Sequence, residues 1–196
     1  EYVANVTNCS YVIVRRFVAV DECGNAAWSE QRVYVEDRTP PYFVEAYLPK
    51  DITVPCHDIP EPSHLHAQDA NNCSDAWVHF AEEKVHFECP NQYTLRRTWT
   101  AVDQCGLKTV HVQLVHVVDE LAPLISGVPD DHDISASCDH VPHPPKVCAR
   151  DNCDGEVQLE FFEDKRHGSC PNESTLVRVW AAQDACGNTA AASYQV

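Results

Sequence analysis

The sequence of 196 residues contains no methionine, only six glycines and no apolar run long enough to span a bilayer. Basic residues are also scarce, since 14 Lys and Arg stand against 30 Asp and Glu and leave a formal net charge of −16. A chain with this charge repels a phosphate backbone, so we expect no nucleic-acid partner. Because no apolar run is long enough, we also expect no membrane span. The chain has neither an initiating Met nor a signal-peptide pattern at Glu1, which indicates a mature chain or an excised piece.

Catalytic motifs are missing from the sequence as well. It contains no Gly-x-Ser-x-Gly, no His-Glu-x-x-His and no glycine-rich loop that would cradle a phosphate. Its carboxylates are spread along the chain rather than gathered at one unrepeated place. We therefore expect a protein that is not an enzyme and has no catalytic residues.

Cysteine, by contrast, is abundant, with eleven residues in the chain and no Cys-x-x-Cys pair that would favour a metal site. This density is typical of an oxidising compartment, where disulfides persist. Asn-x-Ser/Thr triplets also occur and predict attached glycans. We expect an extracellular glycoprotein, secreted or at the cell surface. The four candidate glycosylation sites are Asn5, Asn8, Asn72 and Asn172.

An internal repeat of about 81 residues organises the chain. The segment 93–106 recurs at 174–187 and again at 11–24, each time ending in Asp-x-Cys-Gly. The cysteines of these three segments, Cys23, Cys105 and Cys186, are 82 and 81 positions apart. We interpret the chain as the C-terminal part of a first repeat (1–38), a second repeat (39–120) and a nearly complete third repeat (121–196). Its limits indicate a window from a longer array.

Within a repeat, apolar residues recur with a period of two. In residues 93–101, Leu95, Trp99 and Ala101 fall on one face and threonines on the other, which predicts a strand with one buried side. Asp-x-Cys-Gly then supplies a turn, and several short β-rich pieces precede it. No segment has a helical pattern. The sequence therefore predicts an all-β fold of tandem immunoglobulin-like sandwiches stapled by disulfides.

The order of the strands predicts how the cysteines pair. If the strands run alternately up and down, Cys56 and Cys89 reach one end of a sandwich, and Cys73 and Cys105 reach the other. We predict disulfides within each repeat. Each closes a loop of about 33 residues and contributes about 3–4 kcal/mol of stability. The predicted pairs are Cys56–Cys89, Cys73–Cys105, Cys138–Cys170 and Cys153–Cys186.

Three cysteines have no predicted partner in this chain: Cys9, Cys23 and Cys148. The repeat places the partners of Cys9 and Cys23 before Glu1. Cys148 has no counterpart in the second repeat. It is either a buried free thiol or a link to another chain.

Several motifs resemble the hyalin-repeat (HYR) domain, more closely its four-cysteine variants in tandem on secreted proteins. They are Asp-Asn-Cys at 151–153, Ser-Cys-Pro-Asn at 169–172, Trp-x-Ala-x-Asp-Ala-Cys-Gly-Asn at 180–188 and Val-Val-Asp-x-x-Ala-Pro at 117–123. The second repeat departs from this pattern with Leu107 in place of the Asn. The resemblance implies an immunoglobulin-like fold in extracellular adhesive or structural proteins, generally without catalysis.

Acidic residues are predicted to gather at the joints between repeats. Oxygen-rich clusters at such joints can hold Ca²⁺, which takes six to eight oxygen ligands. The alternative is that each Asp caps a turn through its own backbone. The candidate ligands are Asp37, Asp69 and Asp103 at one joint, and Asp119, Asp151 and Asp184 at the next.

Three arginines recur beside an aromatic residue on the apolar face: Arg15, Arg97 and Arg178. They could form a carbohydrate platform. The interpretation we favour is internal, with the arginine stem on the ring and its head paired to a carboxylate.

Two functions remain open. The first is a structural segment that builds a filament, a surface appendage or a wall layer, with other copies or neighbouring repeats as partners. The second is an adhesin module that binds glycans or a protein, with or without Ca²⁺. A weaker third is an accessory region of a secreted hydrolase.

Overall fold

A computed structural model describes residues 2–4, 6–7, 9–69, 75–170 and 172–196 of the chain. Over these residues the regular structure is entirely β, in fifteen strands, and no helix long and apolar enough to cross a membrane is present. The prediction of an all-β, immunoglobulin-like fold with disulfides is confirmed.

The chain divides into two compact units, and both contain residues of the second repeat. Unit 1 comprises Glu1–Lys50, Pro62–Glu83 and Arg96–Gln113, and unit 2 comprises Asp51–Glu61, Lys84–Leu95 and Leu114–Val196. Each unit therefore contains one of the two predicted joints between repeats. The repeat boundaries themselves stay a prediction, and "first", "second" and "third repeat" below denote residues 1–38, 39–120 and 121–196.

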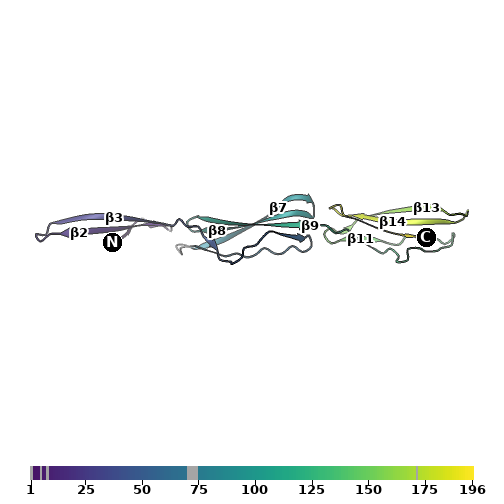
Figure 1. Cartoon of the computed structure of the whole chain (residues 1–196), viewed down its shortest axis with the longest axis horizontal. Helices are drawn as coiled ribbons and strands as arrows, with labels where there is room; N and C mark the ends of the chain where they lie inside the picture. Colours follow the sequence, from purple (N-terminus) through teal and green to yellow (C-terminus); the bar gives the residue numbers. More distant parts are fainter. Residues whose placement is uncertain (1, 5, 8, 70–74, 171) are drawn as a thin grey trace. The chain divides into compact units, whose positions relative to one another are not determined.

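The first repeat forms a three-stranded antiparallel sheet in unit 1. Its strands are β1 (Tyr2–Ala4), β2 (Ser10–Val20) and β3 (Ala26–Glu36), in the order β1-β2-β3. The long hairpin of β2 and β3 is labelled in Figure 1. Its register places Val18 opposite Trp28.

The second repeat contains two sheets. One pairs β4 (Tyr42–Phe43) with β6 (Ala67–Gln68), and the other has the order β5-β9-β8-β7. The four strands of the larger sheet are β5 (Ile52–Pro55), β7 (Ala76–Cys89), β8 (Gln92–Asp103) and β9 (Lys108–Val118). Strand β5 runs parallel to β9 at the sheet edge. The rings of Phe43 on β4 and His111 on β9 lie edge to face, with centroids 6.4 Å apart, so the two sheets are in contact here.

The alternation along β8 is as predicted from Leu95 onward, whereas Thr94, predicted on the opposite face, is also buried. Leu95, Trp99 and Ala101 are buried, whereas Arg96 between them is exposed. In unit 1 the Trp99 indole N–H donates to the Ser63 carbonyl at 2.9 Å, so this buried polar group is satisfied. In unit 2 Leu95 belongs to a separate core, which it shares with Val115 and Val117.

The third repeat, in unit 2, also forms two sheets. The first contains β10 (Leu124–Ser126), β11 (Cys148–Asp151) and β12 (Gly155–Val157), and the second contains β13 (Leu159–His167), β14 (Ser174–Gln183) and β15 (Thr189–Gln195). Trp180 is 4% exposed and stacks on Tyr194 at 5.7 Å between ring centroids. It thus fills the place that Trp99 fills in the second repeat.

The predicted disulfide pairing is wrong. The disulfides are Cys9–Cys105 in unit 1, and Cys56–Cys153 and Cys89–Cys186 in unit 2, with Cα–Cα distances of 5.3, 5.8 and 5.2 Å. Each joins cysteines of consecutive repeats and closes a loop of 96 or 97 residues. The predicted pairs Cys56–Cys89, Cys73–Cys105 and Cys153–Cys186 are thereby excluded, and Cys138–Cys170 is not formed.

The error has a physical reason. The prediction pairs cysteines within one repeat, whereas each bonded cysteine faces a cysteine of the following repeat. Cys9, predicted to have no partner here, is bonded to Cys105. Cys23 and Cys148 are unpaired and exposed, so Cys148 is not the buried thiol that we considered. Cys73 lies outside the described residues.

Candidate functional site: two acidic clusters

Three equivalent turns begin at Asp21, Asp103 and Asp184, and the last two carry predicted site residues. In each Asp-x-Cys-Gly segment, the Asp Oδ1 accepts hydrogen bonds from the backbone N–H two and four positions later. For Asp103 these donors are Cys105 at 2.8 Å and Leu107 at 2.9 Å. The glycine that follows, such as Gly106 with φ +81°, has a left-handed conformation that strains other residues. The turn-capping interpretation is therefore correct for one oxygen of Asp103.

In unit 1, Asp37, Asp69 and Asp103 offer carboxylate oxygens that all lie within 4.8 Å of one another. Asp69 and Asp103 are only 3% and 1% exposed. Asp37 Oδ1 accepts from the Thr39 N–H at 3.2 Å, while Asp37 Oδ2 and Asp103 Oδ2 are buried without a hydrogen-bond partner. Buried, unpartnered carboxylate oxygens are costly, and a cation between them removes the cost.

A second acidic cluster lies in unit 2, around Asp119. Ligand atoms of Asp119, Asp151 and Cys153 lie within 4.8 Å of one another. Asp151 Oδ1 accepts from the N–H groups of Cys153 and Asp154, at 2.7 and 3.0 Å. Asp151 Oδ2 and both carboxylate oxygens of Asp119 are buried without a hydrogen-bond partner. The structure thus brings together all three predicted residues in unit 1, and Asp119 and Asp151 of the three predicted in unit 2.

The electrostatics of the second cluster match this geometry. Burial raises the pKa of Asp119 above its ordinary value, and the neighbouring negative charges of Asp151, Asp184 and Asp154 raise it further. Lost hydration and like-charge repulsion therefore both oppose the ionised form of Asp119. A bound cation would reverse both effects.

The two clusters differ at one position. Asp184 Oδ2 accepts from the Asn188 amide at 2.8 Å, so both of its oxygens have donors and Asp184 contributes charge rather than a free ligand atom. Leu107 takes the place of Asn188 in the second repeat and offers no such donor, which leaves Asp103 Oδ2 available. Leu107 therefore leaves Asp103 Oδ2 without the amide donor that Asp184 Oδ2 has.

The donor atoms fit a hard cation. Carboxylate oxygens are the ligands that Ca²⁺ prefers, and the remaining positions would be filled by water or backbone carbonyls. A zinc site is not supported at Cys56, His57 and Cys153, because the two sulfurs form a disulfide with each other. The residues that would hold Ca²⁺ are Asp37, Asp69 and Asp103 in unit 1, and Asp119 and Asp151 in unit 2.

Two of the three recurring arginines are internal. Arg97 and Arg178 are each 3% exposed, and their Nε atoms donate to Glu82 at 2.7 Å and to Glu163 at 2.6 Å. Arg178 also donates to the Tyr194 hydroxyl at 2.7 Å. Arg15 is exposed. The burial and the carboxylate pairing of the internal interpretation are confirmed for Arg97 and Arg178, which removes them as a carbohydrate platform.

Sequence reasoning missed a further connection across the joint in unit 2. Asp154 Oδ1 accepts from the Asn91 amide at 2.5 Å, and Asp154 Oδ2 accepts from the Ala185 N–H at 2.7 Å. One carboxylate therefore holds residues of the second repeat and a turn of the third. The Cys-Pro-Asn motif at 89–91 was a signal, since it recurs at 170–172.

One predicted glycosylation site can be placed in the structure. Asn172 is exposed in the turn between β13 and β14. Asn5, Asn8 and Asn72 lie outside the described residues. Attached glycans stay a prediction.

Comparisons with known proteins give little further information. No protein-family model and no curated protein matches the sequence, so the hyalin-repeat resemblance stays a prediction. Among solved structures, the protocadherin GammaB4 extracellular domain matches with a TM-score of 0.36 and 16% identity, over 95% of this chain and 36% of that one. Drosophila N-cadherin EC1-4 matches with a TM-score of 0.36 and 14% identity, over 95% and 57% of the two chains. Mouse protocadherin-24 EC1-3 matches with a TM-score of 0.37 and 11% identity, over 94% and 78%. The chain spans about a third to just over half of the first two.

Proposed function

We propose that this chain is a non-catalytic, extracellular structural segment in which consecutive immunoglobulin-like domains are locked together by disulfides and by Ca²⁺ at the joints. Its task is mechanical: to keep a string of small sandwiches short and stiff. Such a segment suits a filament, a surface appendage or a wall layer.

The observation that carries this proposal is the overlap of the disulfide loops. The loop from Cys9 to Cys105 and the loop from Cys89 to Cys186 share residues 89–105. A covalent path from one end of the chain to the other therefore crosses both disulfides and bypasses most residues. Disulfides confined to single domains would not produce this continuous path.

The compartment follows from the same bonds. Structural disulfides persist outside the cell and in the secretory pathway. Each loop of roughly 100 residues contributes about 4.7 kcal/mol in the chain-entropy model. The disulfides thereby compensate for the low stability that small hydrophobic cores provide, such as the cluster of Leu95, Val115 and Val117.

Calcium at the joints is supported by the orphaned carboxylate oxygens. Asp103 and Asp119 are nine-tenths buried or more and direct unpartnered oxygens into clusters of like charge. Because each cluster draws its ligands from two repeats, a bound ion would resist bending at the joint. The ion thus acts in the same direction as the disulfides.

Pulling the chain by its ends tests the mechanical function. With the disulfides intact, the covalent path contains about 34 residues and its full extension is about 120 Å, whereas the reduced chain reaches about 680 Å. Disulfides within single repeats, as the strand order had predicted, would allow about 460 Å. An intact chain that extends beyond about 400 Å contradicts the proposal.

A second function, adhesion, is favoured by one surface. On the β2–β3 hairpin, Trp28 is 61% exposed, and the guanidinium of Arg16 lies 4.4 Å from the centre of its ring. Exposed aromatic and cationic groups of this kind bind sugars and protein partners. A glycan array probed with the wild type and with Trp28→Ala tests this function, and equal binding by both excludes the surface.

A further inference from the structure

Cys170 is exposed and unpaired, yet its counterparts in the other repeats are bonded. Cys89, 81 positions earlier, is joined to Cys186, and Cys9 is joined to Cys105. In both disulfides the partner is the cysteine of an Asp-x-Cys-Gly turn in the following repeat. The same bond thus forms twice, once in each unit, between the same two types of position.

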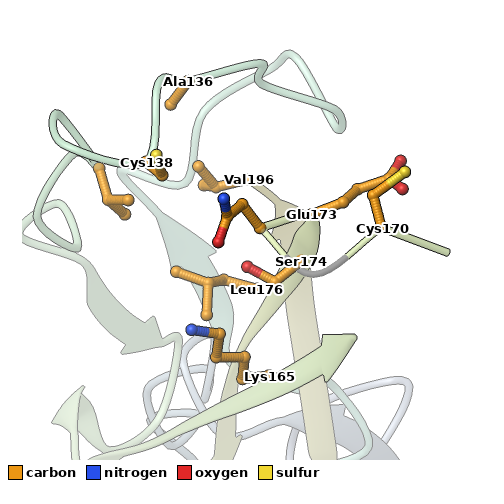
Figure 2. A pocket seen from close by; sticks show the side chains of 10 residues that line it. Ala136, Cys138, Lys165, Cys170, Glu173, Ser174, Leu176 and Val196 are labelled. Carbon is orange, nitrogen blue, oxygen red and sulfur yellow. The ribbon is translucent and has the colours of Figure 1, made fainter. Parts of the chain in front are cut away.

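The end of the third repeat that carries Cys170 is built like the corresponding end of the second repeat. Cys138 and Cys170 line a pocket of about 560 Å³ in unit 2, together with Leu176 and Val196 (Figure 2). The equivalents of these four residues in the second repeat, 81 or 82 positions earlier, are Cys56, Cys89, Leu95 and Val115. Leu95 and Val115 belong to the core of that repeat, and Cys56 packs against it.

The chain contains one Asp-x-Cys-Gly turn whose cysteine, Cys23, forms no disulfide. In the Asp21–Asn25 turn, Asp21 Oδ1 accepts from the Cys23 and Asn25 N–H groups at 3.0 and 2.8 Å, and Asn25 Nδ2 donates to Asp21 Oδ2 at 2.7 Å. The Asp184–Asn188 turn, which holds the bonded Cys186, has the same three bonds at 2.9, 2.8 and 2.8 Å. Cys23 is exposed and unpaired.

We propose that Cys170 is a docking thiol, which forms a disulfide with the Asp-x-Cys-Gly turn of a further domain of this type, as Cys9 and Cys89 do within the chain. A second copy of the chain presents such a turn at Cys23. Oxidation by glutathione disulfide joins the Sγ atoms of Cys170 and Cys23, and the two thiol hydrogens and two electrons convert the oxidant to two molecules of glutathione. Because this contact runs head to tail, each linked copy presents another free Cys170 or Cys23, so the chains join into open oligomers or closed rings. The proposal deepens the structural function proposed above and rests on it.

The test uses the full chain in a glutathione redox buffer, followed by non-reducing electrophoresis and peptide mapping. We expect a ladder of covalent oligomers and a linked peptide pair that contains Cys170 and Cys23. The variants Cys170→Ser and Cys23→Ser should each lower the oligomer fraction at least tenfold. Cys148→Ser is the matched control, because Cys148 is also exposed and unpaired but has no counterpart in the second repeat, and its ladder should be unchanged.

Three results would overturn the proposal: a chain that stays monomeric, a Cys138–Cys170 bond within one chain, or a ladder that depends on Cys148 instead. The peptide map also reports Cys9–Cys105, Cys56–Cys153 and Cys89–Cys186 in every variant, which separates lost docking from misfolding. A monomer that keeps these three bonds rejects docking alone and leaves the proposed function intact, whereas their absence rejects the proposed function.

Discussion

Cys89, the last residue of β7, is bonded to Cys186 in the turn between β14 and β15, 97 positions further along the chain. Two positions after Cys89, Asn91 donates to Asp154, which in turn accepts from the N–H of Ala185, next to Cys186. A covalent bond and a pair of charge-assisted hydrogen bonds therefore hold the same two turns. Both turns belong to unit 2.

Removal of this disulfide should destabilise the chain. The double variant Cys89→Ser/Cys186→Ser lengthens the free chain in the unfolded state, and we expect a loss of about 2–5 kcal/mol of unfolding free energy. Denaturant unfolding of the oxidised protein measures it. Cys148→Ser is the control and should change the unfolding free energy by less than about 0.5 kcal/mol, since Cys148 is exposed and unpaired.

Calcium should raise the thermal stability through the two acidic clusters. At a concentration one hundred times its Kd, the ion adds about 2.7 kcal/mol, which raises Tm by roughly 5–10 °C for a chain of this size. Calorimetry with Ca²⁺ and with a chelator measures the difference. Asp103→Asn and Asp119→Asn should each reduce this gain, because each removes a ligand charge.

The matched control for calcium is Asp164→Asn. Asp164 is an exposed carboxylate that forms an ion pair with the exposed Arg166. Its loss should leave the calcium-dependent gain in Tm unchanged. An equal gain in all four proteins would show that the ion acts without these clusters.

The pH dependence of stability should change at Asp119. The pKa of this carboxyl is raised in the folded protein, so folding favours its protonated form. Its contribution is fully present below the ordinary value for Asp, about 3.9, and is lost as the pH rises through the raised pKa. In chelator, the Asp119→Asn variant should therefore gain stability relative to the wild type between about pH 4 and pH 7.

Thermal unfolding of the two proteins across this pH range measures the effect. With Ca²⁺ present the trend should disappear or reverse, because the wild type then gains a ligand that the variant lacks. A difference in Tm that does not vary with pH in chelator would contradict the burial and charge repulsion inferred for Asp119.

A buried arginine should contribute more to the free energy of unfolding than an exposed one. Arg178→Ala removes hydrogen bonds to Glu163 and to the Tyr194 hydroxyl, and we expect a loss of about 2–3 kcal/mol. Arg166→Ala breaks an exposed pair with Asp164 and should cost less than about 0.5 kcal/mol. Similar losses from both variants, measured by denaturant unfolding, would place Arg178 outside the core.

Much of the fold could be predicted from the sequence because the strand pattern depends on neighbouring residues. The period of two along β8 correctly placed Leu95, Trp99 and Ala101 inside. The repeat likewise grouped the aspartates that the structure brings together, since equivalent positions on a recurring sandwich fall at equivalent places. These properties depend on neighbours in sequence and on the repeat itself.

The pairing of the cysteines could not be predicted in the same way. Strand direction assigns a cysteine to an end of a domain, but that end faces two possible partners: a cysteine of its own domain and a cysteine of the next one. The first choice gave Cys56–Cys89, and the structure has Cys56–Cys153. Similarly, Asp154 carries no local sign that it reaches Asn91, because contacts across a joint depend on how two domains meet.

A disulfide map of the unreduced protein tests the central claim most directly. Digestion without reductant, followed by mass spectrometry, should yield three linked peptide pairs that join Cys9 to Cys105, Cys56 to Cys153 and Cys89 to Cys186. Linked peptides that join Cys56 to Cys89 and Cys153 to Cys186 would show separately closed domains and would contradict the account.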